Sequence, residues 1–585
     1  MHMSFQPSGD QESRLRQFVQ FVGLSGDAVC FIRSENWDEI SKGIDSRDPR
    51  PLVIEYGSGM DYSSLRVWLD SPWRDHNNRA IFFFGSRATA SYQDPETDFS
   101  SGTPRRDRIN IPDVSEIRFS DDTLWGPVQG LRANWPLSTE SLLTTSPELS
   151  GACDPLITIK DQPWFLISKN GGSTVFVWAG AHLPDIFEPL RSGDEERGEH
   201  LLRVLPLLVF LRHAFGKKIW HVPVCFGNFI IDDPPVRDRY GFFEPNRYLA
   251  SLDNVAHATT VAFIPWYWNR STAAAAELFR NHSPQLSLCV HGCDHTGGEF
   301  ASFNRVTLNG KCRLALQRSR LFGERTGLSC QPVMVFPQGR FSKAAVGALR
   351  ETNFLGAVNS TLFTVDTEVG DVRLCNLMEP AYSSIEDFPI FLRRYPRDPV
   401  LCAVDLFLGR PLLVVEHQDY FRHGYGECRR FFEAINGLKC RLAWVPLDQI
   451  VRRACLQREI EPERFEVRFY STSFVLENPS AKCLSYRLVH RCNRPAFVGS
   501  IIVDGRPVAY SFEEGEVTFE LELNPGTSAT VLLVENGFSA NEVFKGSLLY
   551  RARVSARRAL CELRDNHISI ALCARWIKRI ASAIP

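Results

Sequence analysis

The chain has 585 residues, of which 44% are hydrophobic and 23% charged. These values are typical of globular proteins and exclude a largely disordered or fibrous chain. The 66 Lys and Arg and the 68 Asp and Glu give a formal net charge of −2. Because no overall basic excess is present to hold a phosphate backbone, we expect no nucleic-acid partner.

The N-terminal residues, the apolar runs and the cysteines of the sequence bear on the cellular compartment. Charged residues between Asp10 and Arg16 fall where the apolar core of a signal peptide would lie, so we expect no signal peptide. The longest apolar run, 201–215, is interrupted by two arginines and a proline, so no transmembrane helix is expected. The 16 cysteines contain no CxxC pair, which is typical of reduced thiols in a cytoplasmic protein.

Residues 1–220 predict an α/β domain of unknown role. Short apolar runs indicate buried strands, residues 197–215 indicate a helix, and the Pro-, Ser- and Asp-rich stretch at about 93–150 predicts a loop. We expect a mostly parallel sheet with covering helices. The expected strands are 28–32, 51–56, 80–84, 164–168 and 173–180.

Residues 222–453 alternate strand-like and helix-like segments for longer, which favours an irregular (β/α) barrel. In such barrels the chemistry takes place at the C-terminal ends of the strands. The expected strands are 226–232, 259–265, 286–291, 333–337, 354–358 and 411–417. The expected helices are 245–254, 272–281, 306–325, 342–352 and 425–437.

Two smaller segments follow the barrel. Residues 462–536 show short alternating runs separated by turn signals, which predict a β-sandwich. Residues 541–585 have a helical pattern, with nine Lys and Arg against three acids and many apolar side chains. Such a basic amphipathic tail packs on the domains before it or docks on an anionic membrane surface, which would place the protein at the inner face of a membrane.

Two acidic residues close the first predicted strand of the barrel. Asp232 and Asp233 precede Pro234 and Pro235, so one carboxylate can bind a metal ion while the other stays free as a base. A turn with a capping Asp explains the same residues equally well.

Histidines stand at the ends of two further strands. His291 and His295 are four residues apart in a glycine-rich segment, and two imidazoles in one loop suit zinc or another first-row divalent ion. The metalloprotease pattern HExxH fails, because Gly292 stands at the Glu position. Asp294 and Glu299 are candidates only for supporting such ligands. His417 follows a third apolar strand, where a structural role is an alternative.

Taken together, these motifs resemble the polysaccharide deacetylase family, also called the NodB-homology or family 4 carbohydrate esterase group. The segments that match it, in chain order, are IIDD at 230–233, HGCDH at 291–295, VFPQG at 335–339 and VEH at 415–417. The resemblance covers about residues 225–450. It implies a (β/α) barrel of the deacetylase type and a metal-dependent hydrolase that removes acetyl from an N-acetylated sugar in glycan or glycolipid assembly.

The resemblance also implies roles for five residues. Asp233, His291 and His295 would hold one divalent metal ion, with zinc favoured. Asp232 would be the general base that takes a proton from the attacking water, and His417 would be the general acid that protonates the departing amine.

The chain departs from the family pattern at motif three. Val335 stands where the family places the Arg that orients the catalytic Asp, and the replacement candidates are Arg237, Arg239 and Arg340. Loss of this Arg also fits a catalytically weak or inactive glycan-binding or assembly protein. A third alternative is a non-glycan amide hydrolase on the same barrel.

The aromatic run at 264–268 bears on the substrate. Trp266 and Trp268 are candidates for stacking on a sugar ring, although packing of the barrel explains the same run.

Overall fold

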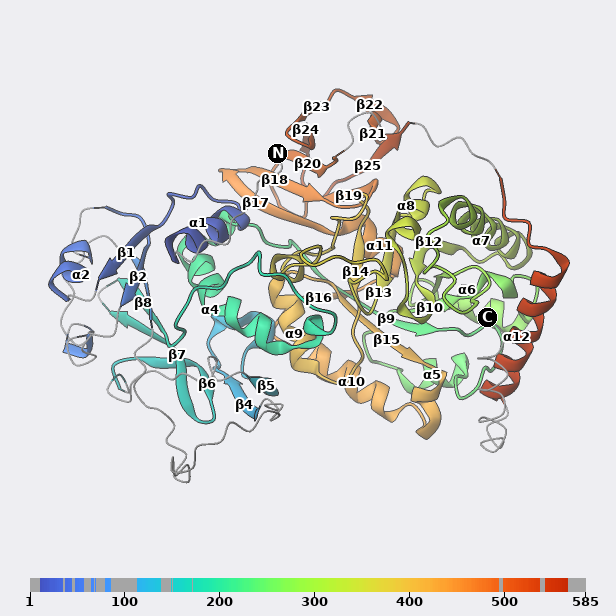
Figure 1. The fold of residues 1–585 in the computed structure, drawn as a ribbon, viewed down its shortest axis with the longest axis horizontal. Coiled ribbons are helices and arrows are strands. Elements are labelled where there is room, and N and C mark those ends of the chain that lie inside the picture. Colours follow the sequence, from blue (N-terminus) through green and yellow to red (C-terminus); the bar gives the residue numbers. More distant parts are fainter. Residues whose placement is uncertain are drawn as a thin grey trace, which may run out of the picture. The chain divides into compact units, whose positions relative to one another are not determined.

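The computed structural model of the chain describes residues 11–34, 37–44, 48–56, 65–67, 69, 79–85, 113–137, 149, 151–170, 172–493, 498–536 and 542–566. The chain forms two compact units (Figure 1). The first consists of Met1–Glu188 and Gly193–Trp220, and the second of Pro189–Ser192 and His221–Pro585. The second unit contains all the segments predicted as barrel, sandwich and tail.

The first unit is built on one mixed sheet in the order β1-β2-β3-β8-β7-β6-β4-β5. Neighbours from β1 to β8 are parallel and those from β8 to β5 are antiparallel, so the prediction of a mostly parallel sheet is wrong. The strands are β1 (Cys30–Ser34), β2 (Leu52–Tyr56), β3 (Ala80–Phe84), β4 (Asp113–Phe119), β5 (Arg132–Leu137), β6 (Asp154–Ile159), β7 (Gln162–Asn170) and β8 (Ser173–Trp178). The described α-helices are α1 (Gln11–Phe21), α2 (Trp37–Ile44) and α4 (Gly198–Phe215).

The loop predicted at 93–150 is also partly wrong, because β4 and β5 lie within it. In β5 every second residue is buried, with Ala133, Trp135 and Leu137 inward and polar residues or Pro136 outward. A strand buried on one face needs only every second residue to be apolar, so its overall composition resembles that of a loop. Residues 86–112 lie outside the described part of the chain.

The barrel of the second unit is a curled parallel sheet in the order β14-β13-β12-β11-β10-β9-β15, with β16 also paired to β9 (Figure 1). Its strands are buried on both faces, as expected for a parallel sheet covered by helices. A single parallel bridge between Arg394 and Val414 joins its two ends, and this makes the barrel irregular. The strands are β9 (Cys225–Asp232), β10 (Thr259–Phe263), β11 (Leu286–His291), β12 (Cys330–Val335), β13 (Gly356–Asn359), β14 (Ile390–Leu392), β15 (Leu412–His417) and β16 (Leu442–Trp444).

Helices cover the outside of this sheet. Each helix predicted from the sequence is present within a few residues, and α9 and α11 are additional. The helices are α5 (Pro245–Ser251), α6 (Ala273–Asn281), α7 (Arg305–Thr326), α8 (Lys343–Glu351), α9 (Pro399–Leu408), α10 (Gly426–Asn436) and α11 (Leu447–Arg453).

The sandwich consists of two sheets, in the orders β17-β18-β20-β24-β23 and β19-β25-β21-β22. It begins at Cys455, before the predicted start at 462, and side chains from both sheets enclose one apolar core. The strands are β17 (Cys455–Glu461), β18 (Arg464–Phe469), β19 (Ser473–Glu477), β20 (Leu484–Arg491), β21 (Val498–Val503), β22 (Arg506–Val508), β23 (Ser511–Glu513), β24 (Glu516–Leu523) and β25 (Ser528–Glu535).

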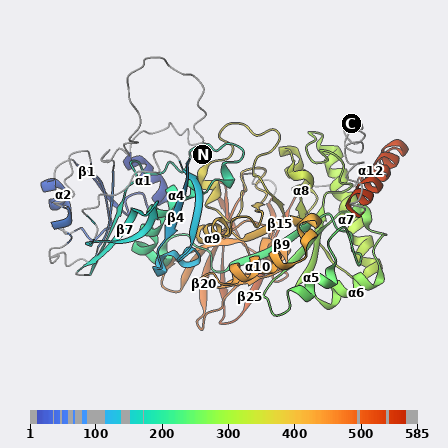
Figure 2. The same ribbon diagram turned by 90° about the horizontal axis from the view of Figure 1, so that it is seen from below.

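The described part of the predicted tail, residues 542–566, contains one helix, α12 (Leu548–Asn566), which lies against the barrel beside α7 in both views (Figures 1 and 2). Residues 541 and 567–585 of the tail lie outside the described residues. Among the helices of the described chain, none combines the length and apolar character needed to cross a bilayer.

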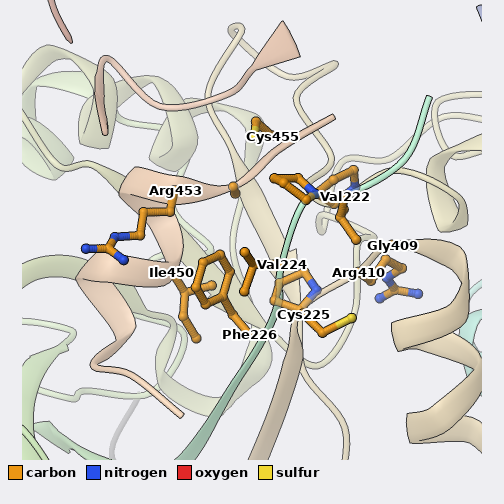
Figure 3. A pocket seen from close by; sticks show the side chains of 13 residues that line it. Val222, Val224, Cys225, Phe226, Gly409, Arg410, Ile450, Arg453 and Cys455 are labelled. Atoms are coloured by element: carbon orange, nitrogen blue, oxygen red, sulfur yellow. The ribbon is translucent and has the colours of Figure 1, made fainter. Parts of the chain in front are cut away.

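A small cavity lies at the N-terminal end of β9 (Figure 3). Val222, Val224, Phe226, Ile450 and Cys455 are among the residues that line it. Its volume of about 20 Å³ has room for one water molecule. Asp232 lies at the opposite end of β9, where His417 of β15 pairs with it.

Candidate metal centre

Strand register brings the polar residues of the four sequence motifs to one end of the barrel. β9 ends at Asp232, and β15 pairs with it so that His417 lies opposite Asp232. β11 ends at His291, which lies opposite Val335 of β12. Because parallel strands end at the same edge of a sheet, residues far apart in the chain converge here.

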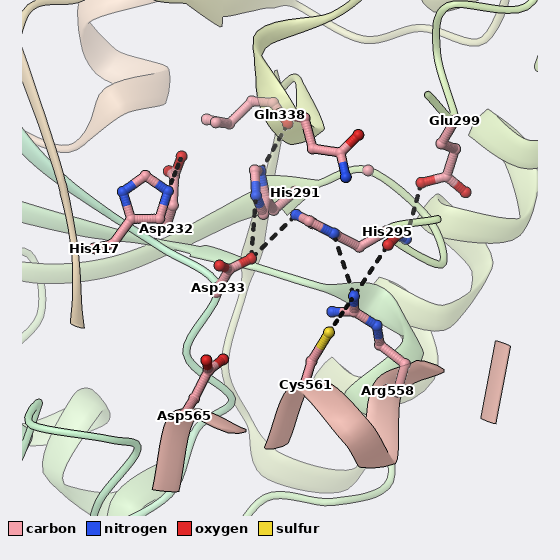
Figure 4. Close-up of polar contacts among 12 residues, drawn as sticks. Asp232, Asp233, His291, His295, Glu299, Gln338, His417, Arg558, Cys561 and Asp565 are labelled. Carbon is pink, nitrogen blue, oxygen red and sulfur yellow. Dashed lines mark hydrogen bonds and ion pairs between the residues drawn. The ribbon is translucent and has the colours of Figure 1, made fainter. Parts of the chain in front are cut away.

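Asp233, His291 and His295 form a compact group of ligand atoms (Figure 4). The Oδ1 atom of Asp233 lies 3.4 Å from Nε2 of His291 and 3.1 Å from Nε2 of His295. The candidate ligand atoms of the three residues lie within 4.8 Å of one another. The sequence predicted this group of ligands, and the structure brings the three side chains together.

The donor set fits a divalent metal ion. Nδ1 of His291 lies 2.9 Å from the carbonyl oxygen of Val335, to which it can donate, leaving Nε2 with its lone pair toward Asp233. Oδ1 of Asp233 is buried and accepts no hydrogen bond, although the two imidazole Nε2 atoms lie at ion-pair distance from it. A buried carboxylate oxygen between two imidazoles is costly unless a cation or a proton compensates it, and a metal ion would do so.

The charges of the group favour an ionised carboxylate. Burial by itself raises the pKa of Asp233, but the imidazoles of His295 and His291 outweigh it and hold the pKa well below its usual value. Burial lowers the pKa of His291, whereas Asp232 and Asp233 raise it, and the net shift is upward. Both shifts arise because opposite charges approach closely in a buried site.

The loop that carries His295 is organised by a buried carboxylate. Glu299 accepts hydrogen bonds from the backbone N–H groups of Cys293, Asp294 and His295 at 2.9–3.1 Å, and its Oε1 lies 3.1 Å from Nζ of Lys311. His295 itself has φ of 53°, a conformation that costs energy in residues other than glycine. Glu299 is therefore a positioning residue, in agreement with the supporting role suggested by its place in the sequence.

A side chain at position 292 would collide with its neighbours. The φ of Gly292 is 68°, and a Cβ atom there would lie 2.4 Å from Cγ of Pro337 and 2.8 Å from Oε2 of Glu299. Any larger residue at 292 would displace the carboxylate that organises the loop.

We predict that Glu299→Gln lowers both stability and metal affinity. The substitution leaves Lys311 buried without its anion, which costs about 3–5 kcal/mol of unfolding free energy. We expect metal affinity to fall about 10–100-fold as His295 loses its support. Urea unfolding and calorimetric zinc titration measure the two effects. The matched control is Glu324→Gln, whose exposed pair with Arg320 contributes less than about 1 kcal/mol. Equal stability of the two variants would contradict the role given to Glu299.

Asp232 is held by a residue that the sequence analysis did not name. Arg393, immediately after β14, donates from Nη1 to Oδ1 of Asp232 at 2.9 Å and from Nη2 to Oδ2 at 2.8 Å. Arg393 is 4% exposed and Asp232 2% exposed. The replacement candidates were therefore wrong: Arg237 pairs with Glu562 and Arg239 with Glu244, and Arg340 makes no hydrogen bond to Asp232 among the described contacts.

This pair keeps the Asp232 carboxylate charged. Burial raises the pKa of Asp232, but Arg393, together with His291 and His417, outweighs burial, and the pKa lies below its usual value. Nε2 of His417 lies 3.9 Å from Oδ2 of Asp232 on the other side, and its side chain is 45% exposed (Figure 4). His417 is thus the solvent-facing member of the group, and Asp232 the buried one.

The two tryptophans proposed to bind substrate have packing partners. Both pack against the apolar core between the sheet and its outer helices. The guanidinium of Arg318 lies over the ring of Trp266, 5.2 Å from its centroid. The carbonyl oxygen of Trp268 accepts hydrogen bonds from Arg325. These contacts favour the packing interpretation of the aromatic run.

A second group of buried ligand-type residues, Cys293, Asp294 and Glu299, lies next to the first. Its carboxylates already have cationic partners: Arg318 donates to Asp294 at 2.7 Å, and Lys311 pairs with Glu299. We therefore assign this group a structural role.

Helix α12 also reaches the centre. Nη2 of Arg558 donates to the carbonyl oxygen of His295 at 3.1 Å, and Arg558 is only 2% exposed (Figure 4). The tail of the chain thus contributes a side chain that contacts the loop of a proposed ligand, which no motif indicated.

Comparisons with known proteins give matches among solved structures only. No protein-family model and no curated protein matches the chain. A family 4 carbohydrate esterase from Streptomyces lividans is 11% identical, with 38% of this chain and 91% of that chain covered and a TM-score of 0.24. Agd3, described as a novel carbohydrate deacetylase, is 10% identical, with 86% and 98% covered and a TM-score of 0.36.

The matches also include a family 4 pseudoenzyme from Bacillus anthracis, which is 11% identical, with 40% of this chain and 66% of that chain covered and a TM-score of 0.24. None of these TM-scores reaches 0.5, so the likeness to these structures carries no conclusion about activity. In its four ordered motifs the chain resembles the polysaccharide deacetylase superfamily.

Proposed function

We propose that the protein is a metal-dependent hydrolase that removes the acetyl group from an N-acetylated sugar. The observation that carries this proposal is the buried Oδ1 of Asp233, which accepts no hydrogen bond and lies 3.4 Å and 3.1 Å from the Nε2 atoms of His291 and His295. Two imidazoles and one carboxylate suit zinc, and other first-row ions bind the same donors.

The metal ion, when bound, would polarise the acetyl carbonyl and lower the pKa of the attacking water. Asp233, His291 and His295 would hold it at the buried end of β9 and β11. Asp232 would accept the proton of the attacking water, because Arg393 keeps its carboxylate ionised and fixes its orientation. His417 would donate a proton to the departing amine from the solvent-facing side of the group.

The alternative of an inactive glycan-binding or assembly protein rested on Val335. Arg393 supplies a cation to Asp232 from a different strand, so the substitution at motif three no longer favours loss of activity. A non-glycan amide hydrolase would use the same groups and differs from the proposal only in its substrate.

The proposal is tested by metal analysis paired with an acetate-release assay on N-acetylated hexosamine oligomers. We expect one divalent ion per chain in the wild type and its loss in His291→Ala. We also expect acetate release that follows metal content. Metal without acetate release from any acetylated sugar, but with hydrolysis of other amides, would support the non-glycan alternative. Metal with no hydrolysis at all would support the binding protein.

A further inference from the structure

Helix α12 presents its polar side to the barrel. Its buried residues are Val554, Arg558 and Asp565. Besides the contact of Arg558 with His295, Glu562 accepts from Arg270 at 2.8 Å, and Asp565 accepts from the hydroxyl of Tyr240 at 2.6 Å. An amphipathic helix on a globular domain ordinarily buries its apolar side, so this orientation is reversed.

Three leucines of α12 face away from the barrel. Leu548 is 83% exposed, Leu549 79% and Leu563 42%. Helical spacing of three and four residues joins Leu549 to Leu563 through the exposed residues Ala552, Ala556 and Ala559. A single exposed leucine needs no explanation, but a stripe along a whole helix indicates a surface that meets an apolar partner.

The charged residues of α12 are also divided between the side that faces the barrel and the side that faces outward. Its acidic residues, Glu562 and Asp565, bond to the barrel. Arg551, Arg553 and Arg564 are exposed, and Arg564 also pairs with Asp565, its Nε lying 2.6 Å from Oδ1. The outward side therefore combines an apolar stripe with basic residues and presents no carboxylate of its own. This combination suits a bilayer with anionic headgroups, where leucines enter the boundary of the acyl chains and arginines meet the phosphates.

We propose that α12 docks the protein on an anionic membrane surface through the outward side of this helix, which we call the outer stripe: Leu548, Leu549, Ala552, Ala556, Ala559 and Leu563 with the flanking arginines. In this proposal one helix packs on the barrel with its polar side and on lipid with its apolar side, which combines the two interpretations of the tail. The proposal does not depend on the hydrolase activity.

Docking in this orientation would bring the candidate metal centre close to the bilayer. The inner side of α12 contacts the loop of His295 through Arg558. An α-helix with its side chains is about 10–12 Å across, so the membrane surface would lie roughly one helix diameter from that loop.

Co-sedimentation of the full chain with phosphatidylcholine vesicles, with and without phosphatidylglycerol, tests the proposal. We expect binding only to the vesicles that contain phosphatidylglycerol, with affinity that falls as salt is added. The double variant Leu549→Gln/Leu563→Gln should bind these vesicles about 100-fold more weakly or worse, because it removes two leucines from the bilayer.

The matched control is Leu532→Gln, in β25 of the sandwich, because Leu532 has the same 42% exposure as Leu563. We expect this control to bind like the wild type, and we expect both variants to keep the wild-type melting temperature and metal content. Absence of binding to anionic vesicles would overturn the proposal, as would equal binding by the double variant. A wild-type dimer that the double variant converts to a monomer, with no vesicle binding, would instead assign the outer stripe to a second copy of the chain.

Discussion

Replacing Asp232 by Asn is expected to lower acetate release about 10²–10⁴-fold while the metal content stays at the wild-type level. Asn has nearly the same shape and can still accept a hydrogen bond from Arg393, but it cannot accept a proton. The metal ligands proposed here are Asp233, His291 and His295, so the substitution removes the base without removing a ligand. Acetate release and elemental analysis of the same preparation measure the two effects.

The result separates a general base from a residue that only supports the fold. Asp253→Asn, an exposed Asp at the end of α5, is the matched control and should keep full activity. Because Arg393 stays buried without its full anionic partner in Asp232→Asn, a thermal melt must accompany the assay. A folded Asp232→Asn protein that keeps both metal and activity would refute the role of Asp232.

The second large effect is expected for Arg393→Met. Asp232 and Arg393 are almost fully buried and joined by two hydrogen bonds, so removal of the cation leaves an uncompensated buried carboxylate. We expect a loss of about 3–5 kcal/mol in unfolding free energy. Urea unfolding measures it, and Arg340→Met, at an exposed Arg that the sequence offered as an alternative partner, should change stability by less than about 0.5 kcal/mol.

In Arg393→Met, ionisation of Asp232 should destabilise the fold, whereas in the wild type it stabilises the fold. In the wild type the pKa of Asp232 lies below its usual value, so its ionisation stabilises the fold at pH values above the unfolded pKa of about 3.9. This stabilisation is lost as pH falls through the pKa that Asp232 has in the folded state. Without Arg393, burial dominates and raises the pKa of Asp232. The contribution of Asp232 to the free energy of unfolding should therefore fall as pH rises above about 3.9.

The same shift should be visible in the activity. Asp232 must be ionised to accept a proton, so the acidic limb of the pH–rate profile should move to higher pH in Arg393→Met. Unchanged unfolding free energy and an unchanged profile would show that Arg393 does not control the charge of Asp232.

Much of the candidate site was accessible from the sequence because its residues lie in local motifs. Asp232 closes an apolar strand and Asp233 follows it, and His291 and His295 stand four residues apart at the end of another strand. Strand-end position and spacing made these residues candidates, and the family resemblance implied the ligand set. The strands of the barrel could be predicted equally well, since strands buried on both faces form continuous apolar runs in the sequence. In the first unit, strands with one polar face, such as β5, lack this signal and were assigned to a loop.

The contacts of Arg393 and Arg558 could not be predicted from local sequence patterns. Arg393 lies 161 residues from Asp232 in the chain and follows the three-residue strand β14, which is too short for any periodicity to mark. Its role depends on which strand ends at the same edge as β9. Arg558 stands in a helix whose composition favoured contact with either a core or a membrane, and the sequence could not tell which side faces which.

The amino-acid sequence by itself determined the α/β barrel, the sandwich and the local groups Asp232–Asp233 and His291–His295, because burial and turn formation impose their periods over a few residues. Only the tertiary structure decided that Arg393 holds Asp232, that Glu299 and Lys311 organise the loop of His295, and that α12 turns its leucines outward. These contacts join residues from different strands and helices, and their geometry is set by the order and register in which the parallel strands pack.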